Sequence, residues 1–260
     1  MQPSHTKDRV VPGPDTNAGT ERLLASVSKR RLCQRHVLPK RGGGNAGKEP
    51  KALNSTGNVV LDFPTGPARA ERFQLHNFDE VRSLLLQTIL TLAVGEEACG
   101  FEHRDLHWGN ILLDRCPEEG EAHFRLRGVD VRVQTAGLKA SLIDFTLSRL
   151  QAVSGEIAFC DLSADPELFQ GPKGDVQADT YRRMRKATRG DWQEHRPKTN
   201  ALWVHYMADI LLNQKQWGGT AAELRRLKRF RRAALGYASA AEAVWDELFE
   251  DLWVSGEEAA

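Results

Sequence analysis

Along this chain, apolar residues recur at helical spacing in several stretches that follow residue 67. The first stretch starts at Asn77 or Asp79, because either side chain can cap a helix start. The apolar positions that follow lie three and four residues apart; they are Val81, Leu84, Leu85, Ile89, Leu92 and Ala93. Since apolar residues cover almost the whole circumference, the pattern predicts a buried helix.

Two further helices are predicted in the second half of the chain. One begins at Asp175 and continues to Lys186. The next has Asn200 as its candidate cap. Its apolar members include Leu202, Val204, Met207, Ile210 and Leu211.

Capping boxes mark the starts of the last two predicted helices. Thr220 with Glu223 opens a very basic helix that is expected to stop at Gly236. Ser239 with Glu242 opens another. The apolar stripe of this last helix, expected in the core, is Ala241, Val244, Trp245, Leu248 and Leu252.

Short β-prone runs lie between the helical stretches. They cover residues 59–63, 111–113, 124–133 and 140–145, while residues 116–122 form a polar turn. The combination predicts an α+β fold that is mainly helical, with short strands around the loop at residues 101–110.

Residues 1–57 have a different composition from the rest of the chain. They are rich in Pro, Gly, Ser, Thr and basic residues and have no sustained period, which predicts a disordered basic segment before an ordered domain at residues 58–255. Residues 42–48 are similar to a phosphate-binding loop, but Glu49 stands where such a loop needs Ser or Thr, so a flexible linker is favoured. The basic residues 29–31 could be a nuclear localisation signal or a nucleic-acid contact. A solvated charged tail is the favoured interpretation.

The cysteines and the hydropathy of the chain indicate in which cellular compartment the protein is expected. The four cysteines have no paired spacing, so neither a zinc site nor a disulfide framework is indicated and a reducing compartment is expected. No apolar run of membrane-spanning length occurs, so membrane contact is not expected. The sequence therefore predicts an intracellular protein, nuclear or cytoplasmic, without sequence-specific nucleic-acid binding.

The chemistry of the chain is concentrated in FEHRDLHWGNILLD, residues 101–114. His103, Arg104 and Asp105 are followed five residues after the aspartate by Asn110. This spacing is typical of a protein-kinase catalytic loop, in which the Asp accepts the proton of a substrate hydroxyl and the Asn holds a magnesium ion on the nucleotide phosphates.

A second motif lies downstream, where a kinase needs another metal-holding carboxylate. The segment SLIDFTL, residues 141–147, supplies Asp144 followed by Phe145 after an apolar strand. Asn110 and Asp144 are therefore the candidate Mg²⁺ ligands, and ATP is the expected nucleotide.

Five segments together resemble the haspin family of atypical Ser/Thr protein kinases. They are residues 101–113, 141–150, 159–169, 175–184 and 192–206. The filler His107-Trp108-Gly109 inside the catalytic loop and Thr146 in place of the usual glycine are features similar to haspin. The resemblance covers about residues 59–255 and implies a kinase-like fold whose mainly helical large lobe carries the catalytic loop.

The resemblance also implies roles for individual residues. Asp105 would be the catalytic base, Arg104 an anchor of the loop and His103 a structural support, while Asp179 would be a buried aspartate that tethers the loop backbone. Arg69 falls where the family has an acid near the ribose. The nucleotide contacts implied by the resemblance are Phe63, Pro64, Gly66, Leu112 and Ile143.

Acidic residues gather just after the second motif. Between residues 156 and 179 there are 6 acids and one lysine, and Asp161, Asp165 and Glu167 are the candidate substrate contacts. A solvated turn is an equal alternative for residues 165–167. By resemblance, the partner would be a basic peptide such as the amino-terminal tail of histone three, with association to chromatin.

The parts of a kinase small lobe are not recognisable before residue 59. No Gly-rich phosphate lid and no strand lysine with its helical glutamate partner is found there, so a truncated small lobe is expected. Two function classes follow: a haspin-type Ser/Thr kinase, or a truncated pseudokinase that binds basic peptides without catalysis.

Overall fold

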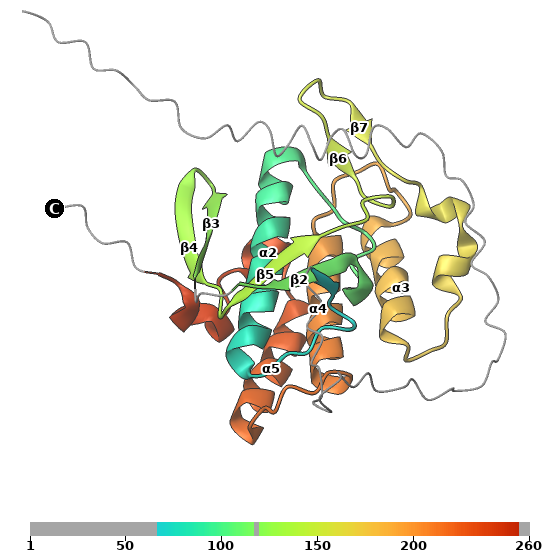
Figure 1. Ribbon diagram of the computed structural model, residues 1–260. Helices are drawn as coiled ribbons and strands as arrows, with labels where there is room; N and C mark the ends of the chain where they lie inside the picture. Colours follow the sequence, from blue (N-terminus) through green and yellow to red (C-terminus); the bar gives the residue numbers. More distant parts are fainter. Residues whose placement is uncertain (1–66, 117–119, 255–260) are drawn as a thin grey trace, which may run out of the picture.

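A computed structural model describes residues 67–116 and 120–254 of the chain (Figure 1). The predictions for residues 1–57 and 59–63, and those for Phe63, Pro64 and Gly66 as nucleotide contacts, lie outside these described residues. Among the described residues, no helix has both the length and the apolar character that crossing a membrane requires.

A long buried helix, α2 (Phe78–Cys99), runs through the centre of the molecule (Figure 1). Its cap is Asn77, whose side chain accepts the backbone N–H of Glu80 at 2.9 Å. The helix ends at Gly100, which has a φ of +55° and closes the last turn in the left-handed conformation that glycine adopts without strain. The predicted buried helix is therefore confirmed.

One small antiparallel sheet packs on α2 and supports the catalytic-loop segment. Its strands lie in the order β1 (Ala68–Arg69), β2 (Ile111–Arg115) and β5 (Leu138–Leu142). Ile111 and Leu113 are fully buried, whereas Leu112 between them points to the other face. The predicted strand at residues 111–113 is confirmed.

Within the part of the chain that the structure describes, two hairpins and four short 3-10 helices complete the fold. In Figure 1 the β6/β7 hairpin projects beyond the end of α2, while β3/β4 stands apart from helices α3 and α4. The predicted strand material at residues 124–133 is a hairpin that turns at Arg127 and Gly128, both with positive φ. The elements are β3 (Glu121–Leu126), β4 (Val129–Gln134), β6 (Leu150–Gln151), β7 (Ile157–Ala158), η1 (Trp108–Asn110), η2 (Leu162–Ala164), η3 (Pro166–Phe169) and η4 (Glu247–Leu252).

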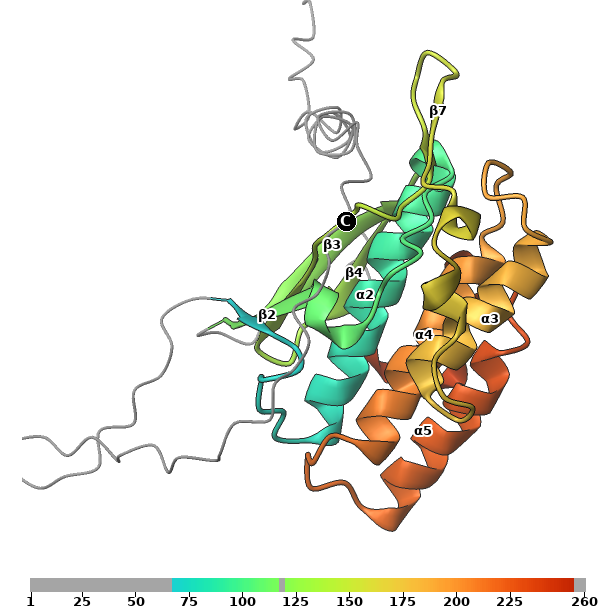
Figure 2. The same cartoon turned by 90° about the vertical axis from the view of Figure 1, so that its right-hand side faces the viewer.

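The remaining helices form the second half of the core. Helix α4 packs against α2, α3 and α5 (Figure 2). The predicted starts at Asp175, Thr220 and Ser239 are confirmed as side-chain caps. The helices are α3 (Val176–Thr188), α4 (Lys198–Asn213), α5 (Ala221–Ala234) and α6 (Ala240–Ala243).

Two predictions about these helices were wrong. Helix α4 begins at Lys198 after Pro197, so Asn200 lies inside the first turn, fully buried, instead of capping the helix. Helix α6 ends after one turn, so helical spacing does not continue to Trp245, which is 61% exposed and stacks on Trp253. The predicted core stripe holds for Val244, Leu248 and Leu252.

The capping box of α5 gives a local test of this part of the fold. The Thr220 hydroxyl accepts the N–H of Glu223, and the Glu223 carboxylate accepts the N–H of Thr220 at 2.7 Å. We expect Thr220→Ala to lower the free energy of unfolding by about 1 kcal/mol, which corresponds to roughly 2–4 °C in Tm for a domain of this size. Thr220→Ser keeps the hydroxyl and should melt near wild type; equal melting of the Ala and Ser variants would contradict the capping role.

Candidate active site

The sheet brings the two motifs together. The catalytic loop leaves α2 and runs into β2, and Asp144 follows β5, the neighbour of β2 in the sheet. The N–H of Ile143 donates to the carbonyl of Asn110 at 3.0 Å, which extends the β2–β5 ladder to the loop itself. Asn110 and Asp144 therefore lie at the same end of adjacent antiparallel strands.

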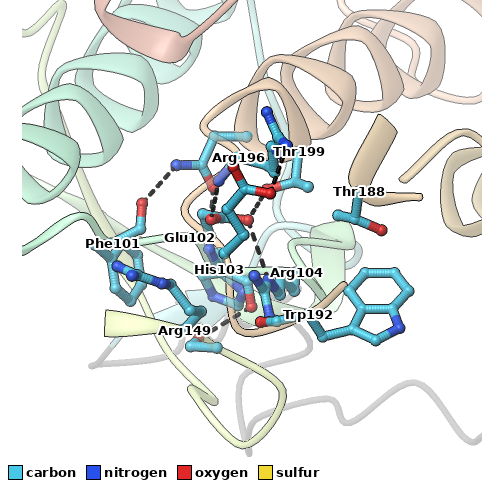
Figure 3. A network of polar contacts seen from close by, with 12 residues as sticks. Phe101, Glu102, His103, Arg104, Arg149, Thr188, Trp192, Arg196 and Thr199 are labelled. Carbon is cyan, nitrogen blue, oxygen red and sulfur yellow. Dashed lines mark hydrogen bonds and ion pairs between the residues drawn. The ribbon is translucent and has the colours of Figure 1, made fainter. Parts of the chain in front are cut away.

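Arg104 anchors the loop from inside the core. Its side chain is fully buried, and its backbone has a φ of +65°, a strained value for a non-glycine residue. The guanidinium donates to the Glu102 carboxylate at 3.1 Å and to the Trp192 carbonyl at 2.6 Å, and it lies 5.5 Å from the ring centroid of Trp192 (Figure 3). These contacts fix the direction in which the next residue, Asp105, leaves the loop.

Glu102 is the centre of this buried network, and the sequence motifs did not identify it. Besides Arg104, its carboxylate accepts the hydroxyl of Thr199 at 2.7 Å and the backbone N–H of Arg196 at 2.6 Å (Figure 3). One feature of the sequence could have identified Glu102. It is an acid that stands between the apolar Phe101 and the catalytic-loop motif, in a stretch expected to be buried, where a charge needs a partner.

Asn200 tethers the loop backbone, the role expected of Asp179. Its amide oxygen accepts the N–H of His103 at 3.0 Å, and its amide nitrogen donates to the carbonyl of Phe101 at 2.9 Å. Asp179 is instead partly exposed on α3 and pairs with Arg182, which lowers the pKa of its carboxyl. The expectation for Asp179 was therefore wrong, because a residue on the next helix, α4, reaches the loop.

His103 is a packed residue of the loop. It is fully buried, its Nε2 lies 3.1 Å from the carbonyl of Ile143, and its ring contacts Phe101 and Phe145 edge-on. Burial lowers the pKa of His103 to about 4, so the ring is neutral near pH 7. The neutral ring supports the main chain on both sides of the site.

Asp105 is the half-buried carboxylate of the loop. Its Oδ1 accepts a hydrogen bond from the hydroxyl of Tyr181 on α3. Burial raises the pKa of Asp105 to about 7, the bond from Tyr181 opposes that rise, and the nearby charge of Asp144 adds to it. An acceptor whose pKa lies near the working pH suits proton transfer from a hydroxyl.

Asn110 and Asp144 are the candidate metal ligands, and their donor atoms fit a hard divalent cation. The Asn110 amide nitrogen donates to the Asp105 carbonyl at 2.9 Å, which leaves the amide oxygen free of that bond. Asp144 is exposed, and its Oδ1 accepts the hydroxyl of Thr146 at 2.7 Å. Within the described ranges no cluster of three or more His, Cys, Asp or Glu side chains could hold a metal by itself. Amide and carboxylate oxygens that are completed by phosphates and water are typical of Mg²⁺.

The open face of the sheet lies beside these ligands. Leu112 pairs with Ser141 across β2 and β5, and strand alternation places Ile143 on the same face. Both apolar side chains are half-buried. Arg69, in β1, donates instead to the carbonyl of Gly109, so it supports the loop.

The candidate substrate acids lie on the segment after the hairpin β6/β7. Asp161 accepts the N–H of Ser163 at 2.9 Å at the start of η2, and Asp165 accepts the N–H of Glu167 at 3.2 Å at the start of η3. All three acids are exposed. Asp161 and Asp165 therefore cap the two short helices of this segment, and their carboxylates remain exposed to solvent.

Comparison with known proteins identifies the family. A model of the haspin-like kinase domain matches residues 31–235. The chain is 48% identical over 195 residues to a serine/threonine-protein kinase haspin homolog of Arabidopsis thaliana, with 75% of this chain and 32% of that protein covered. It is 41% identical over 193 residues to serine/threonine-protein kinase haspin of Bos taurus, covering 71% and 24%, and 34% identical over 205 residues to haspin homolog hrk1 of Schizosaccharomyces pombe, covering 72% and 42%.

The chain belongs to the haspin-like kinase family, and the predicted α+β kinase-like fold is confirmed. It spans between about a quarter and two fifths of the length of these three relatives. The family implies the use of ATP with a divalent metal.

Proposed function

We propose that this chain is a Ser/Thr protein kinase of the haspin type, which transfers the γ-phosphoryl group of ATP to a Thr or Ser hydroxyl in a basic peptide. One observation carries the proposal: Asp105, Asn110 and Asp144 extend from one loop and one strand end that a buried network holds in place. Phosphoryl transfer depends mainly on such positioning and on charge stabilisation.

Each residue has a part in this reaction. Asp105 accepts the proton of the attacking hydroxyl, and the side chains of Asn110 and Asp144 would hold Mg²⁺, which would neutralise charge on the phosphates. Leu112 and Ile143 offer apolar surface to the adenine from the open face of the sheet. Arg104, Glu102 and Asn200 keep the loop fixed without touching the reactants.

The substrate class follows from exposed charge. Asp161, Asp165 and Glu167 present carboxylates on the segment after the hairpin, where a basic peptide gains charge-assisted hydrogen bonds. A histone-tail-like peptide is the partner that fits this chemistry, with a nuclear site of action and association to chromatin.

A second function rests on the exposed acids alone, because their charges can hold a basic peptide whether or not phosphoryl transfer follows. The alternative is a binding module that uses the same exposed acids to hold a basic peptide without catalysis.

One assay separates the two functions. The chain is incubated with Mg-ATP and a histone-three tail peptide that contains Thr beside Arg or Lys, and phosphate on the peptide is read by mass spectrometry. The kinase function requires phosphate on Thr or Ser. Peptide binding in a parallel titration without any transfer would reject the kinase and support the binding module.

Charge reversal tests the substrate surface. We expect Asp165→Lys with Glu167→Lys to weaken peptide binding about tenfold, and the wild-type affinity to fall with salt, because exposed charges are screened within about 8 Å at physiological ionic strength. The matched control is Asp130→Lys with Glu250→Lys, which changes the net charge equally at exposed sites outside this segment. If both double variants bind the peptide like wild type, the acidic segment is not the docking site.

A further inference from the structure

Tyr181 reaches the carboxylate of Asp105 from outside the catalytic loop. It lies in the second turn of α3, 76 positions from Asp105 in the chain, and its hydroxyl donates to Oδ1 of the carboxylate. A carboxylate has two oxygens, so this bond leaves the other oxygen available to a substrate hydroxyl.

The ring of Tyr181 is held rigidly. The residue is 5% exposed, and its ring meets Trp203 of α4 edge-on, with centroids 5.4 Å apart and planes at 87°. Trp203 is itself fully buried and packs edge-on against Tyr206 at 5.1 Å. A ring fixed by this aromatic stack places its hydroxyl at one position.

The direction of the hydrogen bond is also fixed. An ionised carboxylate can only accept, so in the contact with Asp105 the Tyr181 hydroxyl is the donor. Burial and the neighbouring Asp105 raise the pKa of Tyr181, so the phenol keeps its proton. The hydrogen bond from Tyr181 to Asp105 therefore has one direction, from the phenol to the carboxylate.

We infer that Tyr181 is a positioning residue for phosphoryl transfer: from α3, its hydroxyl holds one oxygen of Asp105 so that the other faces the substrate hydroxyl. The inference rests on the proposed function, since it gives Asp105 the role of proton acceptor. Arg104 and Asn110 fix the main chain of the loop, whereas Tyr181 sets the rotation of the carboxylate itself.

The test is Tyr181→Phe, which removes one oxygen and keeps the ring packing on Trp203. We expect kcat for the histone-tail peptide to fall about tenfold with the KM for ATP and for peptide unchanged, because the lost bond orients the base without binding either substrate. The matched control is Tyr237→Phe, which removes a hydroxyl that donates to Asp246 in the C-terminal segment and should leave kcat unchanged.

A thermal-unfolding cycle gives a readout without catalysis. The change in Tm caused by Tyr181→Phe should shrink by at least half when Asp105→Ala is already present, since the partner of the hydroxyl is then gone. Equal changes in both backgrounds would overturn the contact on which the inference depends.

The kinetic outcomes separate this inference from the proposed function. An active wild type whose Tyr181→Phe variant keeps full kcat, or shows only a raised KM, would overturn the positioning role and leave the kinase function intact. A wild type that transfers no phosphate would overturn both.

Discussion

Asp105→Asn is expected to lower phosphoryl transfer to the histone-tail peptide by about 10²–10⁴-fold, because loss of a positioned general base has effects of that size. The substitution keeps the side-chain shape and can still accept the bond from Tyr181. Binding of Mg-ATP and of peptide should therefore persist. The measurement is peptide phosphorylation by mass spectrometry beside binding titrations of both ligands.

Two outcomes would contradict this role for Asp105. Transfer at the wild-type rate would show that another group accepts the proton. Loss of peptide binding together with transfer would show that Asp105 contributes to docking. Asp114→Asn, in β2, is a matched control because it removes a carboxylate outside the loop and should leave transfer unchanged.

Glu102→Ala is expected to destabilise the folded chain more than any other substitution considered. Glu102 and Arg104 are both fully buried, so removal of the carboxylate leaves the guanidinium charge without its partner in the core. Breaking a buried pair in this way costs about 3–5 kcal/mol of unfolding free energy, or roughly 6–20 °C in Tm at this size. Thermal unfolding by circular dichroism measures the change.

The matched control for Glu102 is a substitution at an exposed pair. Glu194 pairs with Arg196 at the surface, with about half of its side chain exposed, and Glu194→Ala should change Tm little because exposed pairs contribute little. Similar melting of the Glu102→Ala and Glu194→Ala variants would mean that the buried network does not determine stability.

The sequence allowed prediction of those parts of the site that depend on local spacing. His103, Asp105, Asn110 and Asp144 lie within two short motifs, and the strand pairing of β2 with β5 brings the motifs together. Some helix starts were also predictable from local sequence. A capping side chain such as that of Asn77 accepts an N–H group from the first turn of its own helix, so the signal lies within a few residues.

The support of the site was not predictable, because its contacts join residues far apart in the chain. Asn200 reaches His103 across 97 positions, and no local pattern distinguishes that tether from a helix cap. The expected tether, Asp179, has a basic neighbour on its own helix that satisfies it. Trp245 was misplaced because the helical period was continued beyond the point where α6 ends.

Helix α3 constrains how the length of this chain can vary. Tyr181 points to Asp105, while the adjacent Arg182 donates to the carbonyls of Phe169 and Gly171 in the segment that carries the exposed acids. One residue inserted between the Asp175 cap and Tyr181 would turn both side chains by about 100° around the helix axis, so both contacts would be lost together. Insertions are therefore expected to be tolerated in the exposed turn at residues 172–174 before the cap, and excluded from the first two turns of α3.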